Sequence, residues 1–180
     1  MALKATIYKA DISIADMDRN YYGDHALTIA RHPSETEERV MIRVLAFALH
    51  ASDALTFTKG MFDTEEPDLW EKDLTGAIRT WIEVGQPDDK RLLKACGRAE
   101  SVIVYSYSAA SPIWYKGLAN RVERAKNLAI VNIPADTSSA LERMAKRGMQ
   151  LQCTIQDGQV WLTDGEDTVQ VEREGWKTPA

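Results

Sequence analysis

The sequence is poor in cysteine and contains no long hydrophobic run. Its 180 residues include two cysteines, Cys96 and Cys153, which are too few for a disulfide framework and indicate a reducing compartment. No segment approaches the roughly 18 consecutive apolar residues that a membrane-spanning helix requires. The first residues, 1–6, lack the apolar stretch of a signal peptide. We therefore expect a soluble, cytoplasmic protein without a membrane segment.

Several common catalytic signatures are missing as well. The glycines form no phosphate-binding loop, and no serine lies in a nucleophile elbow. The three histidines, His25, His32 and His50, are not spaced as metal ligands. His32 precedes Pro33 at the end of a predicted strand, where a structural role is favoured over a contact with acidic residues. Cys96 lies near Lys94 and Arg98, which would lower the pKa of its thiol, but a small core residue is the favoured interpretation.

What is present is an ordinary globular composition with an uneven charge. Hydrophobic residues make up 44% and charged residues 27%, which predicts one folded domain over residues 1–180. The net charge is −5, yet residues 88–147 carry 11 Lys/Arg against 6 Asp/Glu. This basic segment either forms a surface that faces phosphate groups or solvates helix faces. Nucleic acid is therefore the candidate partner, and nothing in the pattern indicates a protein partner or an oligomeric state.

Hydrophobic periodicity predicts an α+β fold. Strands are expected at 6–14 and 26–30, followed by a helix that begins at a Ser34–Glu37 capping box and ends near Ala51. An acidic loop over 60–70 precedes a strand over 76–85 and a basic helix after Pro87. Further along the chain we expect strands at 101–105 and 128–133, helices at 114–124 and 139–146, and a β-meander over 150–172. The alternation of strands and helices predicts at least one parallel strand pair.

Three carboxylates from separate elements are the candidate catalytic residues. Glu38 shares the apolar stripe of the first helix, where a buried charge requires a partner. Asp73 precedes the strand that contains Glu83, so Asp73 and Glu83 are candidate ligands for Mg²⁺ or Mn²⁺. Asp68 or Glu66, in the acidic loop, are alternatives to Asp73. A structural ion-pair role for these carboxylates is the competing interpretation.

The spacing of these acids resembles the PD-(D/E)xK nuclease pattern, with one departure. The pattern places a lysine two residues after the glutamate, and Gly85 stands there. Gln86 is the nearest candidate, although side chains alternate along a regular strand and a bulge at Gly85 would be needed to return it to the side of Glu83. Lys90 or Lys94 would otherwise have to reach the site from the following helix. With Arg91, these lysines are also the candidate nucleic-acid contacts, and Trp114 and Tyr115 beside Lys116 are either core residues or a base-stacking surface.

Several longer strings of the sequence are similar to those of the YaeQ family. They are found at 1–10, 30–36, 66–67, 81–83, 87–88 and 154–158. The resemblance covers nearly the whole chain and implies a variant of the restriction-endonuclease-like fold, a mixed sheet flanked by helices with an added C-terminal β-meander, from Gram-negative bacteria. It implies Glu38, Asp73 and Glu83 as the acids of a degenerate nuclease motif. Two functions follow as hypotheses: a metal-dependent nuclease, and a non-catalytic module that binds nucleic acid or a protein of the transcription machinery.

Overall fold

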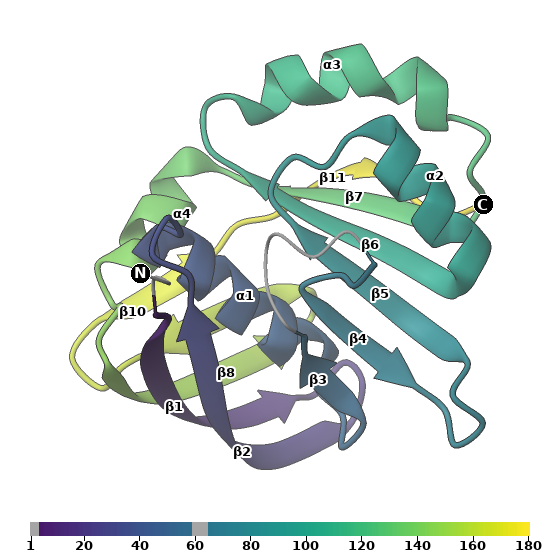
Figure 1. Ribbon diagram of the computed structural model, residues 1–180. Coiled ribbons are helices and arrows are strands. Elements are labelled where there is room, and N and C mark those ends of the chain that lie inside the picture. The colour runs from purple at the N-terminus through teal and green to yellow at the C-terminus, as the bar shows by residue number, and fades with distance from the viewer. Residues whose placement is uncertain (1–3, 59–64) are drawn as a thin grey trace. The chain divides into compact units, whose positions relative to one another are not determined.

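The protein, described here from a computed structural model over residues 4–58 and 65–180, forms two compact units (Figure 1). Unit 1 comprises residues 1–51 and 136–172, and unit 2 comprises residues 52–135 and 173–180. Each unit is therefore built from two separate stretches of the chain. No helix in the described part of the chain is both long and apolar enough to cross a membrane.

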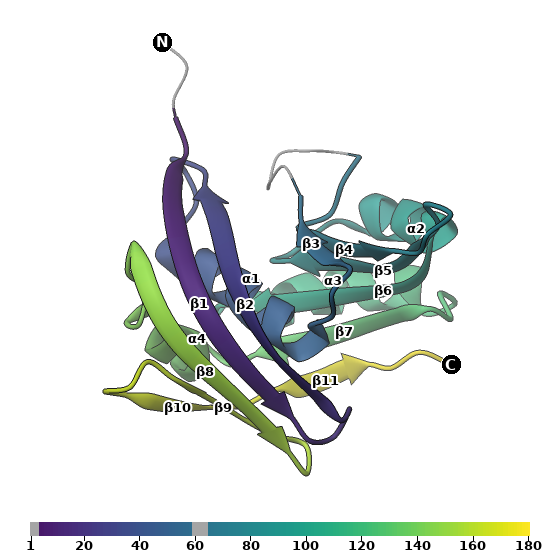
Figure 2. The ribbon, with the colours of Figure 1, turned by 90° about the horizontal axis from the view of Figure 1, so that it is seen from below.

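Unit 1 contains a five-stranded sheet in the order β10-β9-β8-β1-β2. Its elements are β1 (Thr6–Asp16), β2 (Tyr21–Arg31), α1 (Glu37–His50), α4 (Ala135–Glu142), β8 (Gly148–Gln156), β9 (Gln159–Thr163) and β10 (Thr168–Val171). β1 pairs with β8 in parallel, and the other neighbours are antiparallel. α1 and α4 lie on the same face of this sheet (Figure 2). Alternate residues of β1 and β8 are buried, which gives the sheet one apolar face.

Unit 2 contains a six-stranded sheet in the order β11-β7-β6-β5-β4-β3. Its elements are β3 (Leu55–Phe57), β4 (Leu69–Lys72), β5 (Ile78–Val84), α2 (Asp89–Arg98), β6 (Ala99–Tyr107), α3 (Ser111–Val122), β7 (Leu128–Ile133) and β11 (Glu174–Lys177). β5, β6 and β7 are parallel and are connected through α2 and α3, which cover one face of the sheet (Figure 1). Trp81 and Leu92 belong to the core between this face and the helices.

The structure confirms most predicted elements and corrects several boundaries. α1 begins at Glu37, and its N-cap is Thr36, whose hydroxyl accepts a hydrogen bond from the backbone N–H of Arg39 at 3.1 Å. Ser34, the predicted cap, instead donates its backbone N–H to Nδ1 of His32, because residues 32–35 form a turn before the helix. α4 begins and ends about four residues earlier than predicted.

Three short strands, β3, β4 and β11, were not predicted, and one of them lies partly within the predicted acidic loop. β4 begins within the segment predicted as an acidic loop over 60–70, of which residues 60–64 lie outside the described residues. β3 and β11 contain only three and four residues, too few to show alternation in the sequence. The C-terminal meander is confirmed as β8, β9 and β10, with Asp157 and Gly158 both at positive φ in the first turn.

Candidate functional site

Glu83 is a buried carboxylate at the carboxyl end of β5. It is 4% exposed and lies on the same face of the strand as Trp81, two residues earlier. Its Oε1 accepts hydrogen bonds from the indole N–H of Trp81 at 2.9 Å and from Nε of Arg91 at 2.7 Å. Glu83 is therefore held in an ion pair with a cation of α2, which is the partner that a buried carboxylate requires.

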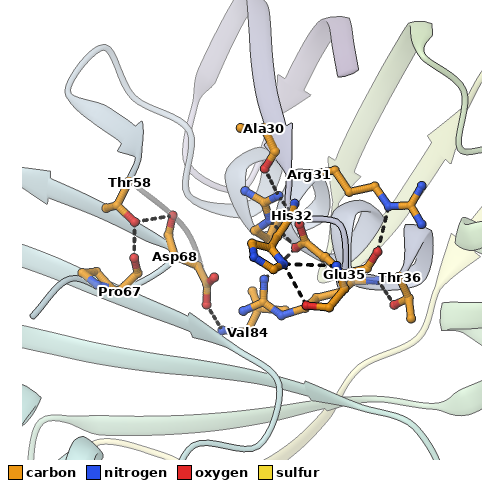
Figure 3. A network of polar contacts seen from close by, with 12 residues as sticks. Ala30, Arg31, His32, Glu35, Thr36, Thr58, Pro67, Asp68 and Val84 are labelled. Atoms are coloured by element: carbon orange, nitrogen blue, oxygen red, sulfur yellow. Dashed lines mark hydrogen bonds and ion pairs between the residues drawn. The ribbon is translucent and has the colours of Figure 1, made fainter. Parts of the chain in front are cut away.

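Asp68 is the second carboxylate near Glu83. It is 3% exposed, and its Oδ2 accepts the backbone N–H of Val84 at 2.8 Å (Figure 3). The antiparallel register of β4 and β5, with Leu69 opposite Ile82, carries Asp68 to this end of β5. Burial raises the pKa of Glu83, the Asp68 carboxylate raises it further, and Arg91 and the Trp81 indole oppose the shift. The structure thus brings Asp68 and Glu83 together.

Asp73 lies at the other end of β5. Its Oδ1 accepts hydrogen bonds from the hydroxyl and backbone N–H of Thr75 and from the backbone N–H of Ala77, within the turn between β4 and β5. The Thr75 hydroxyl is the main reason that the pKa of Asp73 is lowered. At about 3.3 Å per residue, the five steps from Ile78 to Glu83 correspond to roughly 17 Å of strand. The structure does not bring Asp73 and Glu83 together; Asp68 lies next to Glu83 instead.

Gln86 is directed toward the start of α3. Its side-chain N–H groups donate to the backbone carbonyl of Tyr107 at 2.5 Å and to the hydroxyl of Ser111 at 3.0 Å. Gly85, immediately before it, has a φ of +112°, which favours glycine and ends the regular strand. Gln86 therefore links the carboxyl ends of β5 and β6, and the cation beside Glu83 comes from α2.

Glu38 belongs to unit 1, whereas the other three predicted catalytic residues belong to unit 2. Its Oε2 accepts a hydrogen bond from the hydroxyl of Ser138 at 2.8 Å. The requirement that a carboxylate on this helix has a partner is therefore met by a hydroxyl group of α4. Among residues 4–58 and 65–180, no group of three or more His, Cys, Asp or Glu side chains is arranged to hold a metal ion.

The basic residues of α2 converge on a hollow beside the Glu83 ion pair. The helix begins after Asp88, whose side chain accepts the backbone N–H of Arg91, so its first turn is fixed. A cavity of about 350 Å³ is lined by Trp81, Asp88, Lys90, Arg91, Lys94, Ala95 and Arg98. The guanidinium of Arg98 lies over the Trp81 ring, 5.0 Å from its centroid. The structure thus brings together all three predicted nucleic-acid contacts, Lys90, Arg91 and Lys94.

Arg98 and Trp81 are members of this basic hollow that the sequence reasoning did not assign to it. Arg98 lies four residues after Lys94 and seven after Arg91, which is the spacing of one helix face. This helical spacing could have predicted Arg98 as a member of the hollow. Trp81 shares its strand face with Glu83, so the alternation of side chains along the strand could have predicted Trp81.

The remaining candidates have structural roles in unit 2. Cys96 is half-buried and packs against the core of unit 2, and burial raises the pKa of its thiol, which supports the core interpretation over an activated thiol. The indole N–H of Trp114 donates to the carbonyl of Pro87 at 2.8 Å. Tyr115 donates its hydroxyl to the carbonyl of Trp176 and packs against that ring, with centroids 5.2 Å apart. Trp114 and Tyr115 therefore pack against the core of unit 2.

A buried network around Glu35 in unit 1 was not predicted. Oε2 of Glu35 accepts from Arg39 at 2.7 Å and from Arg43 at 3.0 Å, and Oε1 accepts from Arg43 at 2.8 Å. The backbone N–H of His32 also donates to Oε1, and Arg31 donates to the Glu35 carbonyl (Figure 3). Glu35 is 3% exposed, so this network joins the end of β2 to α1.

The described chain is an α+β protein of two mixed sheets and four helices, and solved structures share this fold. The crystal structure of YaeQ protein from Xanthomonas axonopodis pv. citri aligns with a TM-score of 0.93 and 42% identity, covering 97% of this chain and 99% of that chain. The crystal structure of YaeQ protein from Pseudomonas syringae has the same TM-score at 35% identity and covers 97% of both chains.

The sequence comparisons assign the family. Residues 1–173 match the family described as YaeQ protein. The chain is 42% identical to the uncharacterized protein YaeQ of Salmonella typhi and 41% identical to that of Escherichia coli strain K12, and both matches cover 100% of each chain. This chain therefore belongs to the YaeQ family, which confirms the resemblance found in its sequence.

Proposed function

We propose that this protein binds nucleic acid through the basic face of α2. The observation that supports the proposal is the convergence of Lys90, Arg91, Lys94 and Arg98 on one hollow of about 350 Å³. The seven helical steps from Arg91 to Arg98 span roughly 10 Å. Arginine and lysine are the side chains that most often contact phosphate oxygens, and arginine does so with two parallel hydrogen bonds.

The net charge of the whole chain does not oppose this proposal. The chain carries −5 overall, whereas the hollow is lined by four cations, Lys90, Arg91, Lys94 and Arg98, and one carboxylate, Asp88. At physiological ionic strength charges interact over about 8 Å, so a phosphate group responds mainly to nearby side chains. The charge close to the ligand therefore matters more than the total.

Fluorescence anisotropy with labelled 20-nucleotide single-stranded DNA, RNA and duplex DNA tests this proposal. Because each phosphate contact releases counterions, we expect affinity to fall steeply between 50 and 200 mM salt, in the range of about tenfold or more. Charge reversal in Lys90→Glu and in Lys94→Glu should each lower the affinity for the probes relative to the wild type. Lys9→Glu, at an exposed position of β1 outside the basic segment, is the matched control and should have little effect. Absence of salt-dependent binding by the folded protein to all three probes would overturn the proposal.

A second candidate function is metal-dependent hydrolysis of phosphodiesters. It is supported by the two buried carboxylates, Asp68 and Glu83, next to the basic hollow, and by the mixed sheet that a restriction-endonuclease-like core would contain. In the described arrangement, however, the cation that faces Glu83 is the guanidinium of Arg91. These residues fit an ion pair and do not by themselves form a Mg²⁺ or Mn²⁺ site, so we derive no catalytic step from them.

Calorimetric titration with Mn²⁺ separates the two candidates. Binding to the wild type that is lost in Glu83→Ala and Asp68→Asn, with the fold checked by circular dichroism, would support a metal site. A nuclease assay with these variants and with variants of Glu38 and Asp73 would then assign the ligands. If the folded wild type binds no Mn²⁺, even with an oligonucleotide present, the hydrolytic candidate is excluded and nucleic-acid binding alone remains.

A further inference from the structure

The basic hollow of α2 already contacts acceptors from the chain itself. Nζ of Lys94 lies 3.1 Å from Oε1 of Glu65, and Nη1 of Arg98 lies 3.7 Å from Oε2 of the same carboxylate. Arg98 also donates to the Glu65 backbone carbonyl at 2.8 Å, and Arg91 donates to the Glu66 carbonyl at 2.7 Å. Residues 65–66 therefore provide acceptors for three of the four cations.

We infer that Glu65 is an internal competitor for the anionic ligand, and that its carboxylate lies where a phosphate group of that ligand binds. This inference rests on the proposed function of α2. A carboxylate between an ammonium and a guanidinium resembles a phosphate group in charge and in its acceptor oxygens. The ligand to which this geometry points is therefore a phosphodiester whose phosphate bridges Lys94 and Arg98 once Glu65 has moved away.

The exposure of these side chains makes the competition reversible. The side chains of Lys94, Arg98 and Glu65 are 58%, 36% and 63% exposed. Ion pairs between exposed groups are weak because water and salt screen them. Glu65 therefore lowers the affinity for phosphate without abolishing it, since the apparent dissociation constant increases as the fraction of protein in which Glu65 has left Lys94 and Arg98 decreases.

The inference is tested by removing the charge of Glu65 while leaving α2 intact. We expect Glu65→Gln to bind a labelled 20-nucleotide oligothymidylate about two- to fivefold more tightly than the wild type, which is the range that an exposed ion pair contributes. Glu123→Gln makes the same charge change at an exposed position at the end of α3 and should leave the affinity unchanged. In a Lys94→Met background, Glu65→Gln should produce a smaller gain, because one of the two cationic partners of Glu65 has been removed.

Three other outcomes would overturn the inference in distinguishable ways. If Lys94→Glu weakens binding but Glu65→Gln does not strengthen it, Glu65 is no competitor and the proposed binding function stands. Equal gains in Glu65→Gln and Glu123→Gln would mean that net charge alone is responsible. If neither the folded wild type nor Glu65→Gln binds oligothymidylate, RNA or duplex DNA, the proposed function and the inference fail together.

Discussion

Nε of Arg91 lies 2.7 Å from Oε1 of Glu83, and this ion pair connects α2 to the carboxyl end of β5. The glutamate side chain is 6% exposed and the arginine side chain 26% exposed, so the pair is shielded from water for most of its surface. Arg91 also donates to the carbonyl of Glu66, which joins the chain before β4 to the same helix. One arginine thus joins the buried carboxylates to the proposed binding surface.

Removal of Arg91 should destabilise the protein strongly. Arg91→Met leaves Glu83 buried beside Asp68 without its cation, and loss of one partner of a buried pair costs about 3 kcal/mol. Lys90→Met, an exposed neighbour on the same helix, should change the free energy of unfolding by less than about 0.5 kcal/mol. Urea denaturation followed by circular dichroism measures both. The double variant Arg91→Met/Glu83→Gln should recover part of the loss, and equal costs for Met at positions 90 and 91 would contradict the structural role of the pair.

The Glu83 carboxyl should make stability depend on pH in a definite direction. Burial and then Asp68 raise its pKa above the ordinary value of 4.5, so the folded state holds a proton that the unfolded state releases. The stability that the Glu83 carboxyl contributes is therefore fully present below pH 4.5 and is lost as pH rises through the raised pKa. Urea denaturation of wild type and Glu83→Gln between pH 4 and pH 8 measures it: the stability of the wild type relative to the variant should fall with rising pH. Parallel pH profiles would show that Glu83 does not titrate in this way.

Asp73 should act as a turn residue. Asp73→Ala removes the acceptor for Thr75 and Ala77, so we expect a lower melting temperature, while Asp73→Asn retains an acceptor oxygen and should be milder. Because the pKa of Asp73 is lowered from 3.8, its stabilisation is present above that pH and is lost as pH falls through the lowered pKa. Differential scanning calorimetry measures the melting temperatures of these variants, and Mn²⁺ titration of the same variants tests the ligand role. Loss of Mn²⁺ binding in a fully stable Asp73→Asn would favour the ligand role instead.

The Glu35 network should be a main contributor to the stability of unit 1. Glu35→Gln removes the negative charge shared by Arg39 and Arg43 in a buried site, and we expect a loss of about 3 kcal/mol in the free energy of unfolding. Glu142→Gln, at the exposed end of α4, is the matched control. Urea denaturation measures the difference between the two variants. A Glu35→Gln variant as stable as this control would contradict the assignment.

Local patterns in the sequence predicted the elements that have enough residues to show a period. The alternation in β1 and β8, the spacing along α1, and the start of the basic helix α2 after Pro87 all correspond to the structure. The shortest strands, β3 and β11, could not be predicted from periodicity, because backbone pairing with β4 and β7 defines them and their sequences show no period. The sequence did not indicate the division into two units either, because each unit contains segments from both halves of the chain and no linker composition marks their boundary.

The sequence by itself determined that this is an α+β protein of the YaeQ family with a basic helix after a carboxylate-bearing strand. Only the tertiary structure decided which acid faces Glu83. Asp68 and Asp73 are five residues apart, and neither composition nor spacing distinguishes them. The antiparallel register of β4 on β5 does so, because it carries Asp68 to the end of β5 that contains Glu83 and leaves Asp73 in the turn at the other end.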